Sequence, residues 1–192
     1  PFFLYSLPKR EVVSALGEVI KYAAIIDSKF LNVIAKNLDD LIQVDNFQLM
    51  VDFIEKCVGI KAKIIEKDEY EDNIRRILNF GHTVGHALEK YFGYDILRHG
   101  EAVSYGMLVA GKLSVEFGGL SLDDYGLLSQ MIERLPLPLL PDFDVNEIIR
   151  IMTMDKKVKD ANINFVLLSK IGQTKIVDSI SKEKIREVLK LL

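Results

Sequence analysis

A short stretch of the sequence carries five hydrogen-bonding side chains at helical spacing. If residues 70–92 form one α-helix, at about 100° per residue, these side chains share an arc of about 80°. The five are Glu71, Arg75, Asn79, His82 and His86. Asn and His are weak helix formers, and a solvated helix face normally carries Lys, Glu and Gln instead. The side-chain types therefore favour a functional site over a solvated face.

All three histidines of the chain lie between positions 82 and 99. A neutral imidazole binds Zn²⁺ through one nitrogen, and a zinc site that is open for chemistry has about three protein ligands. His82 and His86 are four residues apart, so helical geometry favours them as a metal-binding pair. His99 lies where the next predicted helix begins. The alternative is that one or two of these histidines are packed or hydrogen-bonded without a metal.

Two charged residues lie in the otherwise apolar helix predicted over residues 9–26. Glu18 and Lys21 are three residues apart and point the same way, into or beside the core. A buried charge needs a partner or a metal. The alternative is a local Glu–Lys pair that contributes little.

The composition is that of an ordinary globular domain of 192 residues, with 49% hydrophobic and 28% charged residues. The net charge of -3 gives no general attraction to nucleic acid or to an anionic membrane, and we expect neither as a partner. The single cysteine, Cys57, suits a reducing cytoplasm. The first residues contain neither a basic segment nor an initiator Met, so we expect a fragment of a longer protein.

Hydrophobic periodicity predicts helices near residues 9–26, 29–37, 46–68, 70–92, 100–118, 121–134, 144–153 and 181–191. The best strand candidates are residues 163–169 and 175–177, which would form a hairpin. Prolines exclude a helix over residues 135–141, and the leucines of this connector are expected to be buried. The sequence has no Gly-rich dinucleotide-binding turn. The predicted fold is mainly α, a single multi-helix domain over residues 1–192 with one small β-hairpin near the C-terminus.

These segments together resemble 3-dehydroquinate synthase. The resemblance is densest in two motifs, Leu-Asn-Phe-Gly-His-Thr-Val-Gly-His-Ala over residues 78–87 and His-Gly-Glu-Ala-Val over residues 99–103. It also covers residues 7–11, 17–22, 60–62, 68–71, 155–157 and 165–168. In one departure from the family pattern, Gly17 takes the place of the alanine that usually precedes the glutamate.

The resemblance implies a helical domain that binds metal and substrate and follows an N-terminal Rossmann-like NAD-binding domain, which is absent here. It implies that Glu18, His82 and His99 ligate Zn²⁺, or Co²⁺, which replaces the geometric choice of His86 as a ligand. It also implies a role in the substrate pocket for His86 and for other residues. Lys61 and Arg75 would hold a carboxylate, Asn79 and Lys156 (or Lys157) a phosphate, and Lys21 and Glu71 would complete the lining.

The implied activity is that of a cytoplasmic, homodimeric lyase of the shikimate pathway and aromatic amino acid biosynthesis. It converts a sugar-acid phosphate, 3-deoxy-D-arabino-heptulosonate 7-phosphate, into 3-dehydroquinate and phosphate. This half alone is expected to be inactive. Three alternatives stay open at this point: a related cyclase making an inosose or a valiolone, a metal-dependent polyol dehydrogenase, and a noncatalytic metal-binding helical module.

Overall fold

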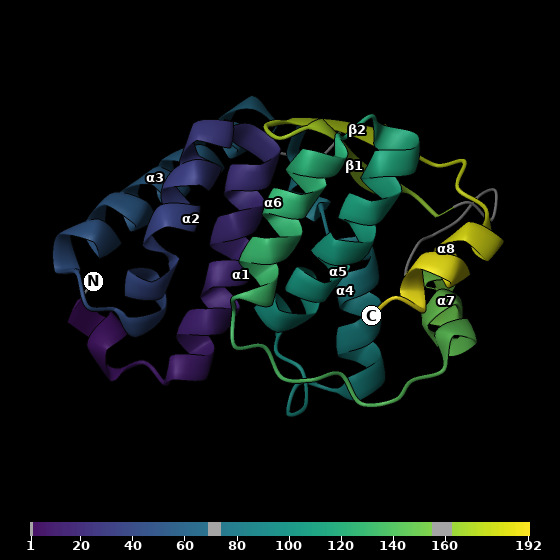
Figure 1. Ribbon diagram of the computed structural model, residues 1–192, viewed down its shortest axis with the longest axis horizontal. Helices are drawn as coiled ribbons and strands as arrows, with labels where there is room; N and C mark the ends of the chain where they lie inside the picture. Colours follow the sequence, from purple (N-terminus) through teal and green to yellow (C-terminus); the bar gives the residue numbers. More distant parts are fainter. Residues whose placement is uncertain (1, 69–73, 155–162) are drawn as a thin grey trace.

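The computed structural model describes residues 2–68, 74–154 and 163–192. The described residues are mainly helical, with one antiparallel hairpin near the C-terminus, as predicted (Figure 1). The α-helices are α1 (Lys9–Ile26), α2 (Ser28–Gln43), α3 (Phe47–Lys67), α4 (His82–Phe92), α5 (His99–Leu113), α6 (Leu122–Glu133), α7 (Val145–Met154) and α8 (Lys182–Leu189). The other elements are the 3₁₀ helices η1 (Phe2–Ser6) and η2 (Ile74–Asn79), the π-helix η3 (Ser114–Gly118), and strands β1 (Phe165–Lys170) and β2 (Gln173–Val177).

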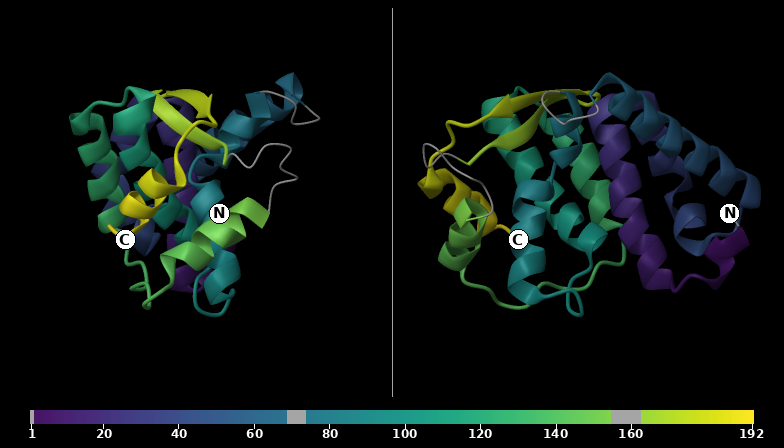
Figure 2. Two further views of the ribbon diagram at one scale, coloured as in Figure 1. Left: turned by 90° about the vertical axis from the view of Figure 1, so that its right-hand side faces the viewer. Right: turned by 180° about the vertical axis from the view of Figure 1, so that it is seen from behind.

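Helix α5 is the centre of the molecule. Helices α1 and α4 pack on it, α2 and α3 lie beyond α1, and α7 lies beyond α4 with α8 against it (Figures 1 and 2). The hairpin crosses one end of the bundle, where the N–H of Gly172 donates to the carbonyl of Ala24 at 2.8 Å. The hairpin therefore closes the end of the bundle opposite to the start of α1.

Two hydrophobic cores meet at α5. One face of this helix packs with α1, α2, α3 and α6, through Val103, Met107 and Ala110. The other face packs with α4, α7, α8 and β1, through Ala102, Val109 and Leu113. Because α5 is buried on both sides, its position is fixed by both cores at once.

The predicted helix starts and stops agree with the local hydrogen bonds. The side chains of Asn46, Ser121 and Ser181 each accept from a backbone N–H in the first turn of α3, α6 and α8. Gly119 adopts φ = 103° and ends η3. These signals are local, so the sequence alone reveals them.

Three predictions about elements were wrong. The single helix over residues 70–92 does not exist, because η2 ends at Asn79 and Gly81 adopts φ = 79° before α4 begins. The second helix runs on to Gln43, since Leu38, Leu41 and Ile42 continue its buried face. In the proline-rich connector Leu135 is buried as expected, but Leu139 is 93% exposed.

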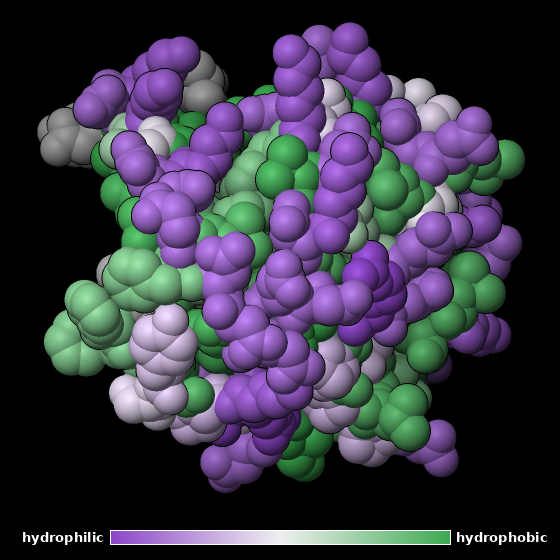
Figure 3. Space-filling view, turned by 60° about the vertical axis from the view of Figure 1, so that its left-hand side comes forward, coloured by the Kyte–Doolittle hydropathy of each residue, from purple (hydrophilic) through white to green (hydrophobic). Residues whose placement is uncertain are grey.

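The face on the α2 and α3 side carries mostly hydrophilic side chains, with apolar ones between them (Figure 3). Within the described ranges, no helix has both the length and the apolar character that a bilayer crossing requires.

An ion pair between a half-exposed arginine and a buried carboxylate joins the start of α1 to the start of α5. The carboxylate of Glu101 is fully buried and accepts from Arg10 Nε at 2.6 Å and Arg10 Nη2 at 2.8 Å. The same carboxylate accepts from the backbone N–H of Arg98 at 2.8 Å, and Arg10 also donates to the Ile96 carbonyl at 2.6 Å. Arg10 therefore compensates a buried charge and fixes the loop that leads into His99.

We predict that Arg10→Ala lowers the free energy of unfolding by about 2–3 kcal/mol, because it leaves the Glu101 carboxylate buried without its charged partner. Urea denaturation followed by circular dichroism measures the loss. Lys9→Ala is the matched control. Among the described residues, the Lys9 side chain makes only an exposed hydrogen bond to Gln43, so its loss should change stability by less than about 0.5 kcal/mol. An Arg10→Ala variant as stable as Lys9→Ala would contradict the role given to this pair.

Candidate metal centre

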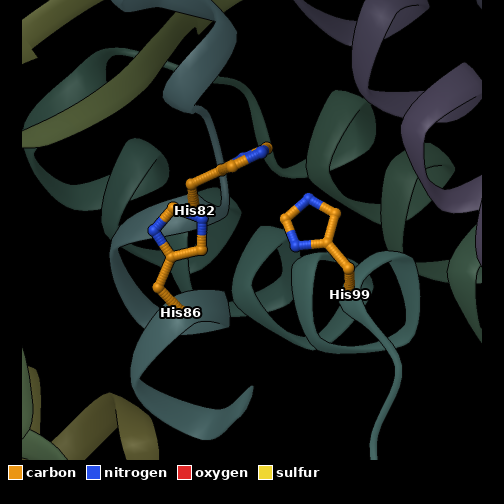
Figure 4. Close-up of side chains that lie close together, drawn as sticks. All are labelled: His82, His86 and His99. Carbon is orange, nitrogen blue, oxygen red and sulfur yellow. The ribbon is translucent and has the colours of Figure 1, made fainter. Parts of the chain in front are cut away.

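The three candidate zinc ligands of the resemblance come from three helices. Glu18 lies near the middle of α1, His82 is the first residue of α4, and His99 is the first residue of α5. Figure 4 shows the rings of His82, His86 and His99 converging from two helices. The ring centroids are 5.1 Å apart for His82 and His86 and 5.2 Å apart for His82 and His99. Tertiary packing therefore gathers residues that lie far apart in the sequence.

Glycines let these helices touch through their backbones. A side chain at Gly100 would overlap the carbonyl of Ser14 on α1, and one at Gly106 would overlap the carbonyl of Gly81 just before α4. The N–H of Gly100 also donates to Ser14 Oγ at 3.0 Å. Because α1 and α4 both rest directly on α5, their polar residues come within reach of His99.

The unusual glycine at position 17 takes part in this packing. A Cβ there would lie 2.5 Å from the carbonyl oxygen of Gly100 and 2.5 Å from Ser104 Oγ. Ser104 Oγ itself donates to the carbonyl of Gly100 at 2.8 Å. In this chain α5 thus fills the space next to position 17, and glycine fits there because it has no side chain.

One carboxylate oxygen of Glu18 faces both histidines. Glu18 Oε1 lies 3.6 Å from Nε2 of His82 and 3.9 Å from Nε2 of His99. This oxygen is buried, and no group among the described residues makes a hydrogen bond to it. A buried polar atom without a partner is uncommon, and an ion is one of the groups that satisfy such an atom.

The outer nitrogens of the two rings have acceptors of their own. His82 Nδ1 lies 3.2 Å from the carbonyl oxygen of Phe80, and His99 Nδ1 lies 3.0 Å from Glu89 Oε2. In a neutral imidazole these contacts place the proton on Nδ1 and leave the lone pair on Nε2. Two lone pairs and a carboxylate oxygen then meet without a proton between them, which fits a divalent cation.

The spacing also suits zinc. Ligand atoms about 2.0–2.1 Å from a tetrahedral Zn²⁺ are about 3.3–3.4 Å from one another. The two measured separations, 3.6 and 3.9 Å, exceed this value by a few tenths of an ångström. Small side-chain adjustments would therefore suffice for these residues to hold a zinc ion, and three protein ligands would leave a fourth tetrahedral position open.

Lys21 forms a hydrogen bond with the second carboxylate oxygen of Glu18. Its Nζ donates to Glu18 Oε2 at 2.7 Å, and the residue is 2% exposed. Burial lowers the pKa of Lys21, Glu18 opposes this effect, and the charge of Lys61 lowers the pKa further. Burial alone would raise the pKa of Glu18, but the charge of Lys21 and its hydrogen bond lower it below its usual value. Glu18 is therefore ionised, with Oε1 facing the histidines.

His82 is held neutral. Burial, and then the charge of Lys21, lower the pKa of His82 to about 4. Because only the neutral ring binds a metal, protons do not compete at this residue near neutral pH. The pKa values of His82 and Glu18 both favour a cation at this point.

The structure brings together both sets of candidate ligands, the helical pair His82 and His86 and the set Glu18, His82 and His99 that the resemblance implies. The nearest ligand atoms of His82, His86 and His99 all lie within 4.8 Å of one another. His86 is exposed, however, whereas His82 and His99 are partly buried and face Glu18 Oε1. This geometry favours Glu18, His82 and His99 as ligands and leaves His86 at the open side of the cluster.

The remaining candidate residues lie on neighbouring elements. Lys61 is exposed on α3, close enough to the centre for its charge to affect Lys21. Arg75 and Asn79 lie on η2, which is tied to the end of α3 because the N–H of Arg75 donates to Asp68 Oδ2 at 2.8 Å. The predicted sites at Glu71, Lys156 and Lys157 fall outside the described residues.

Sequence reasoning gave no role to the polar groups around the start of α5. Arg10 and Glu101 hold the segment from which His99 projects, and Glu89 contacts the His99 ring. One signal was available for Glu89, which lies seven residues after His82 and so on the same face of a helix. The contact between Arg10 and Glu101 spans 91 residues, and no local spacing reveals it.

This chain is similar in sequence to known 3-dehydroquinate synthases. The 3-dehydroquinate synthase of Geobacter metallireducens is 38% identical over 175 residues, covering 91% of this chain and 48% of that protein. The 3-dehydroquinate synthase of Thermoanaerobacter pseudethanolicus is 38% identical over 188 residues, covering 97% of this chain and 52% of that protein. The chain thus spans about half the length of the curated relatives that it matches.

Two solved structures share the fold. The 2-epi-5-epi-valiolone synthase of Streptomyces hygroscopicus, solved with NAD⁺ and Zn²⁺ bound, has a TM-score of 0.88 at 22% identity and covers all of this chain and 53% of its own. A 2-deoxy-scyllo-inosose synthase complexed with carbaglucose-6-phosphate, NAD⁺ and Co²⁺ has a TM-score of 0.83 at 23% identity, with 96% of this chain and 53% of its own covered. At these identities the likeness establishes the fold.

The family follows from a match that covers all three candidate metal ligands. The family model described as 3-dehydroquinate synthase C-terminal matches residues 15–158, a range that includes Glu18, His82 and His99. The chain therefore belongs to the 3-dehydroquinate synthase family.

Proposed function

We propose that this chain is the metal- and substrate-binding half of a 3-dehydroquinate synthase. The complete enzyme converts 3-deoxy-D-arabino-heptulosonate 7-phosphate into 3-dehydroquinate and phosphate in the shikimate pathway, and it is a carbon–oxygen lyase. The observation that carries the proposal is the convergence of Glu18 Oε1 with the Nε2 atoms of His82 and His99, in a chain of this family. The half-length match to the relatives supports a separate NAD-binding half, without which this half is inactive.

The proposed cofactors are Zn²⁺, or Co²⁺ in its place, and NAD. The two related cyclases were solved with NAD⁺ and with one of these metals, which supports the assignment. Glu18, His82 and His99 hold the ion, and the other half of the enzyme binds most of the NAD. The metal supplies Lewis acidity toward substrate hydroxyls, and NAD supplies reversible oxidation of one of them.

The cationic residues of this half bind the two anionic ends of the substrate. Lys61 and Arg75 hold the carboxylate, which the planar guanidinium can grip with two hydrogen bonds. Asn79 and Lys156 hold the phosphate, with Lys157 as a substitute for Lys156. The position of Lys61 beside the metal centre and of Arg75 on the adjoining η2 supports this division.

The remaining polar groups act on the substrate between its two ends. His86 lies on the open side of the centre, where its ring can exchange a proton with the substrate. Lys21 and Glu71 complete the polar lining. Most of the catalytic effect of this half is positioning and charge stabilisation, because the substrate phosphate can itself remove the proton.

A second candidate is a related sugar-phosphate cyclase, which the TM-scores of 0.88 and 0.83 favour as an alternative. Such cyclases use substrates without a carboxylate, so a working carboxylate grip at Lys61 and Arg75 separates the two functions. Placement in the cytoplasm and assembly as a homodimer, which the family resemblance implies, belong to the same proposal.

The proposed function predicts which substitutions remove the metal. In the full-length enzyme, His82→Ala, His99→Ala and Glu18→Gln should each weaken Zn²⁺ binding more than about 100-fold, which exceeds the range for losing an outer partner of a ligand. His86→Ala should retain the metal and lose turnover. Elemental analysis after dialysis against a chelator measures the metal content. Loss of metal in His86→Ala with retention in His99→Ala would show that the three-histidine set is the correct one.

Another prediction concerns the substrate carboxylate. Lys61→Met in the full-length enzyme should lower kcat/KM about 10- to 100-fold, since a charge-assisted hydrogen bond contributes about 1.5–3 kcal/mol. Lys63→Met, about 200° around α3, is the matched control and should have little effect. Steady-state kinetics should be measured on the natural substrate and on an analogue that lacks the carboxylate, where the loss should vanish. Equal losses on the two substrates would favour the alternative cyclase.

A further inference from the structure

The ring of His99 lies between two carboxylates from different helices. Nε2 lies 3.9 Å from Glu18 Oε1 on α1, and Nδ1 lies 3.0 Å from Glu89 Oε2 on α4. Within the described part of the chain, His99 is the one group that contacts the Glu89 side chain through a hydrogen bond or ion pair. The side chain of Glu89 is 23% exposed, so it is partly shielded from water.

The contact with Glu89 determines which ring nitrogen of His99 is free to bind a metal. An ionised carboxylate only accepts hydrogen bonds, so a neutral His99 paired with Glu89 carries its proton on Nδ1. The lone pair of Nε2 then points toward Glu18. The partner also limits ring rotation, which matters here because His99 is the first residue of α5 and its side chain is 36% exposed.

The two histidines are supported in different ways. His82 Nδ1 contacts the backbone carbonyl of Phe80, which no substitution removes. His99 Nδ1 depends on a side chain from another helix. Glu89 lies two helical turns after His82 on the same face of α4, so this helix contributes one ligand directly and supports another.

We propose that Glu89 is a positioning residue of the metal centre, which fixes the tautomer and orientation of His99 and so sets the metal affinity and coordination geometry. The inference rests on the proposed function, because it requires a metal held by Glu18, His82 and His99. Carboxylate partners of metal-binding histidines raise the basicity of the ligand, and their loss typically weakens metal binding 10- to 100-fold. The competing explanation is a peripheral ion pair that contributes only to stability.

The test compares Glu89→Ala, Glu89→Gln and the control Lys90→Ala in the full-length enzyme. Lys90 is the adjacent, exposed residue of α4. Competition with a chromophoric chelator measures the Kd for Zn²⁺. We expect Glu89→Ala to weaken binding about 10- to 100-fold. Glu89→Gln should restore most of the affinity, because its amide oxygen still accepts from Nδ1. Lys90→Ala should match the wild type.

Two further measurements separate positioning from stability. The visible absorption of the Co²⁺-loaded enzyme should change in Glu89→Ala and stay unchanged in Lys90→Ala, because ligand-field bands report the geometry at the metal. The melting temperature of the metal-free protein should be the same for both variants. Wild-type Kd and an unchanged Co²⁺ spectrum in Glu89→Ala would overturn the inference, as would a metal-free Glu89→Ala protein that melts well below Lys90→Ala.

The outcomes also distinguish this inference from the function on which it rests. If the wild-type enzyme binds no Zn²⁺, or if His99→Ala leaves the Kd unchanged, the proposed metal centre fails and the role of Glu89 fails with it. If the wild type binds Zn²⁺ and His99→Ala abolishes binding while Glu89→Ala does not weaken it, the role of Glu89 alone fails.

Discussion

Direct backbone contact between helices decides where the polar groups of this protein meet. Helices that pack through larger side chains lie about 8–10 Å apart. Here Gly100 places α5 against the carbonyl of Ser14, and Gly106 places it against the carbonyl of Gly81. Glu18, His82 and His99 each lie within a few residues of one of these contacts. A larger side chain at either glycine would move a helix, and with it the candidate metal ligand on that helix.

The charges around Glu18 are arranged so that the centre is ready for a cation. Lys21 takes one carboxylate oxygen and keeps Glu18 ionised, while burial and the charge of Lys21 keep His82 neutral. One lysine therefore has two effects that both favour metal binding. Little ionisation has to change when the ion binds, which reduces the competition from protons.

A second set of polar contacts surrounds the start of α5. Glu101 is buried and joins Arg10 to the backbone of Arg98, Arg98 in turn pairs with Glu11, and Glu89 contacts His99. Arg10, Glu11 and Glu101 tie the loop before His99 to α1. Residues 93–96 of the loop are exposed to water and Leu97 is buried, so the polar contacts and this one apolar side chain together hold the loop before His99.

The sequence alone determined the helical class, the hairpin, the helix starts near residues 46, 121 and 181, and the family, because periodicity and motifs are local signals. It also placed His82 and His86 on one face, since both lie within α4. It was wrong about one helix over residues 70–92, because the backbone contact with Gly106 places Gly81 in a conformation that ends helical periodicity. Only the tertiary structure brought Glu18 to the histidines and paired Glu89 with His99. Those contacts depend on how closely separate helices approach, and that distance is set by packing across the core, which no local pattern records.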